Sequence, residues 1–202
     1  MRHISWDDGF KNDFLIKHGV NPEHIYVTGN PANELLHREQ INTPIYREKL
    51  SREFRLNSTK RWLFFPMNYG WAFLKKKSLA FRIKNGYPRD IAYAYADFAK
   101  KGLLKFIRFL EIIAQTNDFE IIIRPHPSIT TDDYIKIFKA NNIAIPPNVH
   151  FHKNYTIKEW IIASDIIGSS WSTSVWDAYN IGKATFYFKP FPWPEWLNTW
   201  WL

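Results

Sequence analysis

The chain has 202 residues, which is enough for one domain or slightly more, and its 46% hydrophobic and 18% aromatic content allows a substantial core. The absence of cysteine excludes disulfides and thiolate metal sites. No segment approaches the ~20 apolar residues that are needed to span a bilayer. The N-terminus lacks the apolar stretch of a signal peptide. A net charge of +8 favours anionic partners such as phosphates, nucleotides or acidic lipid surfaces, although solvated lysines of a basic protein would also explain it. A cytoplasmic location is the default expectation.

The first part of the chain predicts a short strand, two helices and a buried strand. The strand at 24–28 ends at the turn sequence Gly29-Asn30-Pro31, and helical patterns follow at 32–40 and 46–54. A buried strand is predicted at 61–65, ending before Pro66. Residues 67–86 are expected to be irregular and basic.

The second part alternates regularly between helices and strands. Apolar residues recur at three- and four-residue steps from Ile91 to Ile113 and predict one long amphipathic helix that begins after Pro88. The elements expected after it are a strand at 119–123, a helix at 131–140, a strand at 149–152, a helix at 156–163, a strand at 165–168, a helix at 173–180 and a strand at 184–188.

This alternation predicts an α/β fold: a Rossmann-like parallel sheet with helices on both faces. Ligands of such sheets bind outside the carboxyl ends of the strands. Three loops are expected there: 67–71, the Arg-Pro-His-Pro turn that contains His126, and the hydroxyl cluster 169–174. Their side chains and a helix N-terminus would suit an anionic ligand.

Three segments together resemble the donor-binding half of GT-B glycosyltransferases of bacterial surface polysaccharides. The similar enzymes are the capsule and lipopolysaccharide sialyl- and Kdo-transferases and the CDP-glycerol-type transferases. The matching segments are Ile25-Tyr26-Val27-Thr28-Gly29-Asn30-Pro31, Arg124-Pro125-His126-Pro127, and Ser172-Thr173 with Trp176-Asp177-Ala178 and Gly182-Lys183. Asp177 stands in place of the usual Glu, and Ala184 in place of the usual Pro.

The resemblance implies an inverting glycosyltransferase with a nucleotide-sugar donor, a CMP-activated acid sugar first and CDP-glycerol as the alternative. It places His126 at the leaving phosphate, as a hydrogen-bond donor or an acid. The donor nucleotide and its phosphates would be bound by Arg124, His126, Ser169, Ser170, Ser172, Thr173 and Asp177. No cofactor or metal is implied, and the acceptor would be a polysaccharide or a lipid-linked sugar.

Each of these residues also has an ordinary structural interpretation. Ser172 and Thr173 could simply cap the following helix, Asp177 could be a solvated acid in its first turn, and Arg124 could form a structural ion pair. Asp7 and Asp8, followed by Gly9, match the motif that holds the catalytic base in bacterial sialyltransferases, but a turn would have the same composition.

The domain organisation suggested by the resemblance has three parts: a remnant of an N-terminal domain and inter-domain segment (1–57), a Rossmann-like nucleotide-sugar-binding domain (58–190) and a Trp-rich tail (191–202). A GT-B enzyme needs two such domains, so the chain is expected to be a fragment that transfers poorly alone. Tail tryptophans 193, 196, 200 and 201 would face a partner domain or a membrane surface. A non-catalytic nucleotide-binding domain is the alternative, and no nucleic-acid-binding module is recognised.

The alternating pair His150 and His152 is the one arrangement in the sequence that suggests a metal. Both side chains are expected on the same side of a strand. No acidic cluster accompanies them in the sequence, and Lys153 follows, so a metal role is not favoured.

Overall fold

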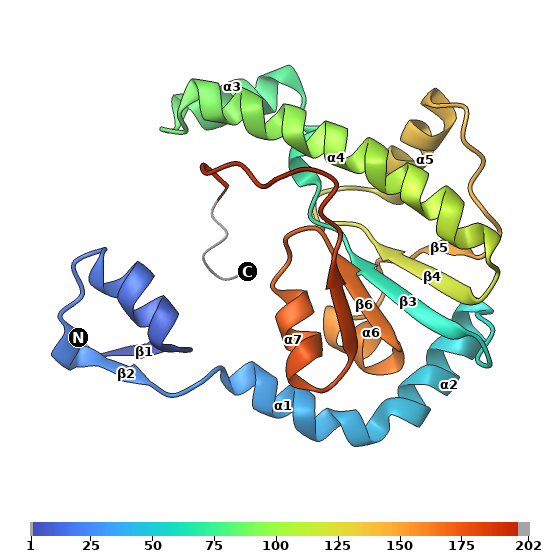
Figure 1. Ribbon diagram of the computed structural model, residues 1–202, viewed down its shortest axis with the longest axis horizontal. Coiled ribbons are helices and arrows are strands. Elements are labelled where there is room, and N and C mark those ends of the chain that lie inside the picture. Colours follow the sequence, from blue (N-terminus) through green and yellow to red (C-terminus); the bar gives the residue numbers. More distant parts are fainter. Residues whose placement is uncertain (1, 198–202) are drawn as a thin grey trace.

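The computed structural model of the chain describes residues 2–197 and contains a five-stranded parallel sheet (Figure 1). The strands lie in the spatial order β5-β4-β3-β6-β7. Their bounds are β3 (Arg61–Pro66), β4 (Phe119–Arg124), β5 (Val149–Phe151), β6 (Ile166–Ser169) and β7 (Ala184–Tyr187). Chain order reverses between β3 and β6, which is the strand order of a Rossmann-like sheet.

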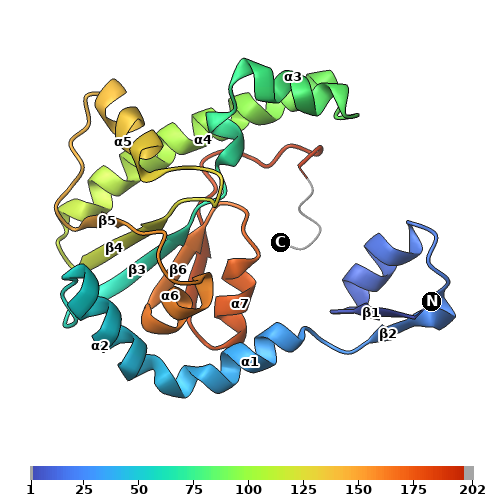
Figure 2. The same ribbon diagram turned by 180° about the vertical axis from the view of Figure 1, so that it is seen from behind.

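Helices cover both faces of this sheet (Figures 1 and 2). Helices α4 (Arg89–Gln115) and α5 (Thr131–Ala140) lie on one face, and α3 (Lys76–Lys84) continues that layer beyond the sheet. Helices α1 (Pro31–Glu39), α2 (Thr43–Phe54), α6 (Ile157–Ala163) and α7 (Ser174–Asn180) lie on the other. The predicted α/β fold with helices on both faces is therefore confirmed.

The two halves of the core follow from the period of two along the strands. Leu63 and Phe65 of β3 enter the core beneath α4 and α5. Trp62 and Phe64 alternate with them and enter the core beneath α2 and α6. Helices α1 and α2 also contribute core residues, so the core of the sheet unit begins well before residue 58.

A small N-terminal unit (residues 2–29) stands apart from the sheet and is joined to it by α1 (Figure 1). It contains strands β1 (His3–Ser5) and β2 (Ile25–Val27), which pair in parallel, and a π-helix over Phe10–Ile16. The sequence predicted β2 but not β1. Figure 2 shows the unit facing the α7 side of the sheet domain.

The expectation that residues 67–86 are irregular is wrong. They contain a 3₁₀-helix at Gly70–Phe73 and α3 at Lys76–Lys84. Leu79 is the one residue of α3 that is buried, so the helix shows almost no apolar periodicity in the sequence. Every other predicted strand and helix is present, with ends that differ by at most three residues.

The described part of the tail packs on its own domain rather than facing outward. Trp196 contacts Tyr95 and Phe98 of α4, with ring centroids 5.3 Å and 5.9 Å away, and Trp193 is half-buried against the same core. The predictions for Trp200 and Trp201 lie outside the described residues. No helix within residues 2–197 is both long and apolar enough to cross a bilayer.

Candidate functional site

Two hollows lie beside each other at the carboxyl edge of the sheet, around the point where the strand order reverses. We call them the His126 hollow and the N-terminal cleft. Trp171 borders the first and Thr173 borders the second, with Ser172 between them. This is the edge at which open α/β sheets bind their ligands.

The His126 hollow has a volume of about 710 Å³ and is formed by the loops after β3, β4 and β6 together with α3 and α4. Its lining combines aromatic rings with charged and polar groups: Asn68, Gly70, Trp71, Phe73, Leu74, Lys75, Ser78, Arg82, Tyr95, His126, Ser128, Ile129, Asp133 and Trp171. The carboxylate of Asp133 is already engaged, because it accepts hydrogen bonds from the backbone N–H and the hydroxyl of Thr130. Lys75 and Arg82 have no ion-pair partner among the described residues.

The loop after β4 fixes the imidazole of His126. Its Nδ1 lies 3.3 Å from the backbone N–H of Ser128, which donates to it, and 2.8 Å from the hydroxyl of the same residue. The neutral ring therefore bears its proton on Nε2. Burial, and secondly the charge of Lys153, lower the pKa of His126. The ring is consequently a neutral hydrogen-bond donor through Nε2 near pH 7.

Two cations brace this loop through backbone carbonyls. Lys153 donates to the carbonyls of Pro127 and Ile129, at 2.8 and 2.9 Å. Arg124 donates to the carbonyls of Lys153 and Asn154, at 2.8 and 3.2 Å, and lines neither hollow. Arg124 thus joins the loops after β4 and β5, whereas the sequence suggested a phosphate fork or an ion pair.

Ser169 and Ser170 are buried and point into the protein. The hydroxyl of Ser169 donates to the carbonyl of Pro66 at 3.0 Å, and the hydroxyl of Ser170 is hydrogen-bonded to that of Tyr69. Neither residue lines a hollow. They tie the end of β6 to the loop after β3, and their predicted contact with a donor gains no support from this position.

Ser172 and Thr173 precede α7, as the sequence suggested. The hydroxyl of Ser172 accepts from the backbone N–H of Ser174 at 3.3 Å and donates to its hydroxyl at 3.1 Å. Ser172 is thus engaged at the start of the helix. Thr173 is exposed and reaches the N-terminal cleft.

The N-terminal cleft has a volume of about 950 Å³ and separates the N-terminal unit from α7. Three predicted site residues line it: Asp7 from one side, and Thr173 and Asp177 from the other. Its remaining lining is aromatic, amide or glycine: Trp6, Gly9, Phe10, Gly29, Asn30, Asn33, Trp176 and Asn180. His126 does not line this cleft, so the structure divides the predicted site between two neighbouring hollows.

The carboxylates of the cleft differ in their surroundings. Burial raises the pKa of Asp177, which the charge of Lys158 partly opposes. Asp7 is exposed and its Oδ1 accepts the backbone N–H of Phe10 at 2.6 Å, so it caps the first turn of the N-terminal helix. Asp8 is exposed and lines neither hollow.

Sequence reasoning missed several lining residues, notably Trp6, Trp176 and Asn68. Trp6 and Trp176 are 51% and 42% exposed, which is unusual for tryptophan on a surface that is not a binding site. Both amide atoms of Asn68 are buried without a hydrogen-bond partner. The sequence placed the loop 67–71 at this edge, but no signal singled out Asn68 within it.

His150 of β5 and His152, just after it, have parallel rings whose centroids are 6.2 Å apart, as expected for side chains on one side. Glu120 of the neighbouring strand lies 2.5 Å from Nε2 of His150. His152 stacks on Trp160 instead. Within residues 2–197, no group of three or more His, Asp or Glu side chains is placed to hold a metal ion.

Comparison with solved structures relates the fold to that of a known enzyme. No protein-family model matches the sequence, and no curated protein matches it. Among solved structures, the wall teichoic acid polymerase TagF aligns over 92% of this chain with 18% identity and a TM-score of 0.53. A histidine-to-alanine variant of TagF gives 18% identity and a TM-score of 0.55, and a variant soaked with CDPG gives 16% and 0.53.

The alignment covers only part of TagF. The chain spans 38% of the length of the TagF chain that it matches. At this level of identity the likeness concerns the fold. The chain has a GT-B glycosyltransferase-like fold and corresponds to one half of that architecture.

Proposed function

We propose that the chain binds a cytidine-nucleotide-linked donor at the carboxyl edge of its sheet, as the donor-binding part of a surface-polymer transferase. The observation that supports this most directly is the place of His126. Its ring lies one strand from the reversal of strand order, in a hollow that also contains Lys75 and Arg82. A phosphate bound there would meet an imidazole N–H and two cations.

His126 would act on the leaving nucleotide. As the acceptor hydroxyl attacks and the bond to the nucleotide phosphate breaks, negative charge grows on that phosphate. Nε2–H of His126 would donate a hydrogen bond to it. Because the pKa of the ring is lowered, hydrogen bonding by the neutral ring is a better description than protonation by an imidazolium.

The base that takes the acceptor proton would come from the N-terminal unit. Asp7 is the better candidate of the predicted pair, because it lines the cleft and Asp8 does not. The absence of the Glu-x7-Glu pattern of retaining enzymes favours direct displacement with inversion.

Of the two donor classes, CDP-glycerol is now favoured over a CMP-activated acid sugar. TagF, a wall teichoic acid polymerase studied with CDPG, has the same fold. In addition, Asp7 and Asp177 line the N-terminal cleft and no Lys, Arg or His does. The carboxylate of an acid sugar would be repelled there, whereas a glycerol group would not.

Nucleotide binding by calorimetry tests the proposal. We expect CDP to bind more tightly than CMP, and both more tightly than AMP. His126→Ala should weaken CDP binding by about 1–3 kcal/mol, because one charge-assisted hydrogen bond is lost. His126→Gln, which keeps an N–H donor, should weaken it less.

His18→Ala is the matched control, since His18 is an exposed histidine that lines neither hollow. It should leave the affinity unchanged. Equal affinity of wild type and a folded His126→Ala variant would refute the role of His126. Binding without any transfer or donor hydrolysis would favour the alternative, a non-catalytic nucleotide-binding domain.

A further inference from the structure

We infer that the N-terminal cleft binds an uncharged polyhydroxyl ligand, a neutral sugar or polyol, and excludes anions. The site itself is argued from its lining, and its place in a transfer reaction rests on the proposed function. Both walls offer a tryptophan and an aspartate. Trp6 and Asp7 come from the N-terminal unit, Trp176 and Asp177 come from α7, and Asn33 of α1 and Asn180 of α7 add amide groups to the lining.

The charge of the cleft opposes that of the rest of the protein. The whole chain has a formal charge of +8, yet the lining contains two carboxylates and no Lys, Arg or His. The charge of Lys158 lowers the pKa of Asp177 and partly opposes burial, but Lys158 lies outside the lining. Phosphate or carboxylate groups would therefore be repelled here and drawn to the neighbouring His126 hollow, where Lys75 and Arg82 lie.

The polar groups of the cleft have free hydrogen-bonding capacity that suits hydroxyl groups. No described residue donates a hydrogen bond to the carboxylate of Asp177, which lines the cleft. Its oxygens are acceptors, and ligand hydroxyls are donors that can satisfy them. A partly buried acceptor without a donor is unfavourable, so a hydroxyl placed beside Asp177 would stabilise the site.

The two tryptophans provide the apolar part of the site. Trp6 is stacked on Phe10, with ring centroids 5.6 Å apart, so one of its faces is held in place. Trp176 makes an edge-to-face contact with Tyr179. Trp176 itself remains 42% exposed. Aromatic faces are negative and attract the C–H groups of a sugar ring, while the hydroxyls at its edge reach the Asp and Asn side chains.

This inference changes the predicted role of one residue. Asp177 was expected to bind the donor nucleotide. Its position opposite Asp7 assigns it instead to hydroxyls of the ligand in the cleft. The neutral part of the substrate would then lie next to the candidate base.

Titration by NMR with lactose and 3′-sialyllactose tests the inference, because the second sugar adds to the first a sialic acid residue that bears one carboxylate. We expect lactose to shift the indole N–H signals of Trp6 and Trp176, assigned by substitution with Phe. Sialyllactose should bind roughly fivefold more weakly, because of repulsion by the two aspartates.

Variants separate stacking from charge. Trp176→Ala should weaken lactose binding roughly threefold to tenfold, the effect of one aromatic contact. The control is Tyr93→Ala, since Tyr93 is an aromatic residue on α4 that is 53% exposed and lies outside the cleft, and it should have no effect. Asp177→Asn should reduce the discrimination against sialyllactose.

Two results would overturn the inference: no shift of either indole signal with lactose, or binding of sialyllactose at least as tight as that of lactose. Both leave the nucleotide test unaffected, since CDP binding is measured at the other hollow. Conversely, lactose binding by a chain that does not bind CDP would refute the proposed function and leave a sugar-binding cleft.

Discussion

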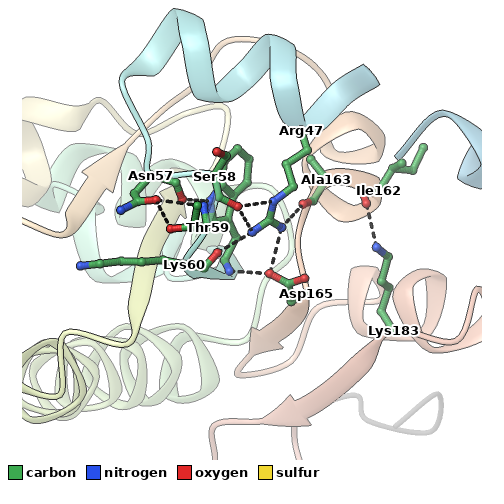
Figure 3. Close-up of polar contacts among 10 residues, drawn as sticks. Arg47, Asn57, Ser58, Thr59, Lys60, Ile162, Ala163, Asp165 and Lys183 are labelled. Carbon is green, nitrogen blue, oxygen red and sulfur yellow. Dashed lines mark hydrogen bonds and ion pairs between the residues drawn. The ribbon is translucent and has the colours of Figure 1, made fainter. Parts of the chain in front are cut away.

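Arg47 of α2 ties three elements together at the amino edge of the sheet, opposite the candidate site (Figure 3). Its guanidinium donates to the carbonyls of Ser58 and Lys60, which precede β3, and to that of Ala163 at the end of α6. It also pairs with Asp165 at 2.9 Å. We predict that Arg47→Ala is strongly destabilising.

The expected loss is about 3 kcal/mol in the free energy of unfolding. The side chain of Arg47 is only 19% exposed, and hydrogen bonds to charged groups contribute about 1.5–3 kcal/mol each when they are not in water. Its contact with the ring of Trp62, at 4.6 Å, adds about 0.5–1 kcal/mol. Asp165 moderates the loss, because it is 41% exposed and keeps its bond from the backbone N–H of Trp62.

Urea denaturation followed by circular dichroism measures this loss. Arg47→Lys keeps the charge but not the planar fork, so about 2 kcal/mol should still be lost. Arg52 on the same helix is the control. It pairs with Glu48, and both side chains are more than 70% exposed, so Arg52→Ala should cost less than about 0.5 kcal/mol. The reasoning fails if Arg47→Ala costs under about 1 kcal/mol or if Arg47→Lys equals wild type.

Two further predictions concern the sheet domain. Burial lowers the pKa of His152 from 6.5 to about 4, so the unfolded chain binds more protons between these values and stability should fall as pH drops from 6.5 towards 4. Urea titrations at pH 6.5 and pH 4 measure the free energy of unfolding at each pH. In His152→Phe the decrease between these two pH values should be about 2 kcal/mol smaller than in wild type. An equal decrease in both proteins would contradict the lowered pKa of His152. Gly168→Ala would place a Cβ 2.5 Å from the ring of Phe65 and 2.6 Å from that of Phe186, so thermal unfolding should show a loss of about 1–3 kcal/mol. An unaltered melting temperature would mean that both rings can move aside.

Local signals were sufficient to predict the sheet and most of its helices. The run Ile121–Ile123 is apolar on both faces, as expected for a strand covered on both sides, and Thr130 forms the capping box that fixes the start of α5. Helix α3 was missed because its packing is minimal. Its first turn contains Lys76 and Lys77, and Leu79 is its one buried residue, so tertiary contacts, mainly with α4, hold it in place.

The site could be predicted only in its coarse position. The rule that loops after parallel strands share one edge placed His126, Ser172 and Thr173 at the same side of the sheet, but it also predicted a single pocket, whereas His126 and Thr173 line different hollows and Ser172 lines neither. It could not show that the hydroxyls of Ser169 and Ser170 turn inward to the loop after β3. Nor could it show the second wall of the cleft, since β1, which pairs with β2 over only three residues, is too short to leave a sequence pattern.

The separation of charge between the two hollows constrains how a substrate can bind. One hollow holds His126 with Lys75 and Arg82, and the other holds two carboxylates and no cation. A molecule with an anionic end and a neutral end can satisfy both hollows in only one orientation, with its phosphates towards His126. The bond that joins its two ends would then lie near Ser172, which stands between the hollows. Transfer requires that His126, which stabilises the leaving group, and Asp7, the candidate base, both act on groups next to this bond.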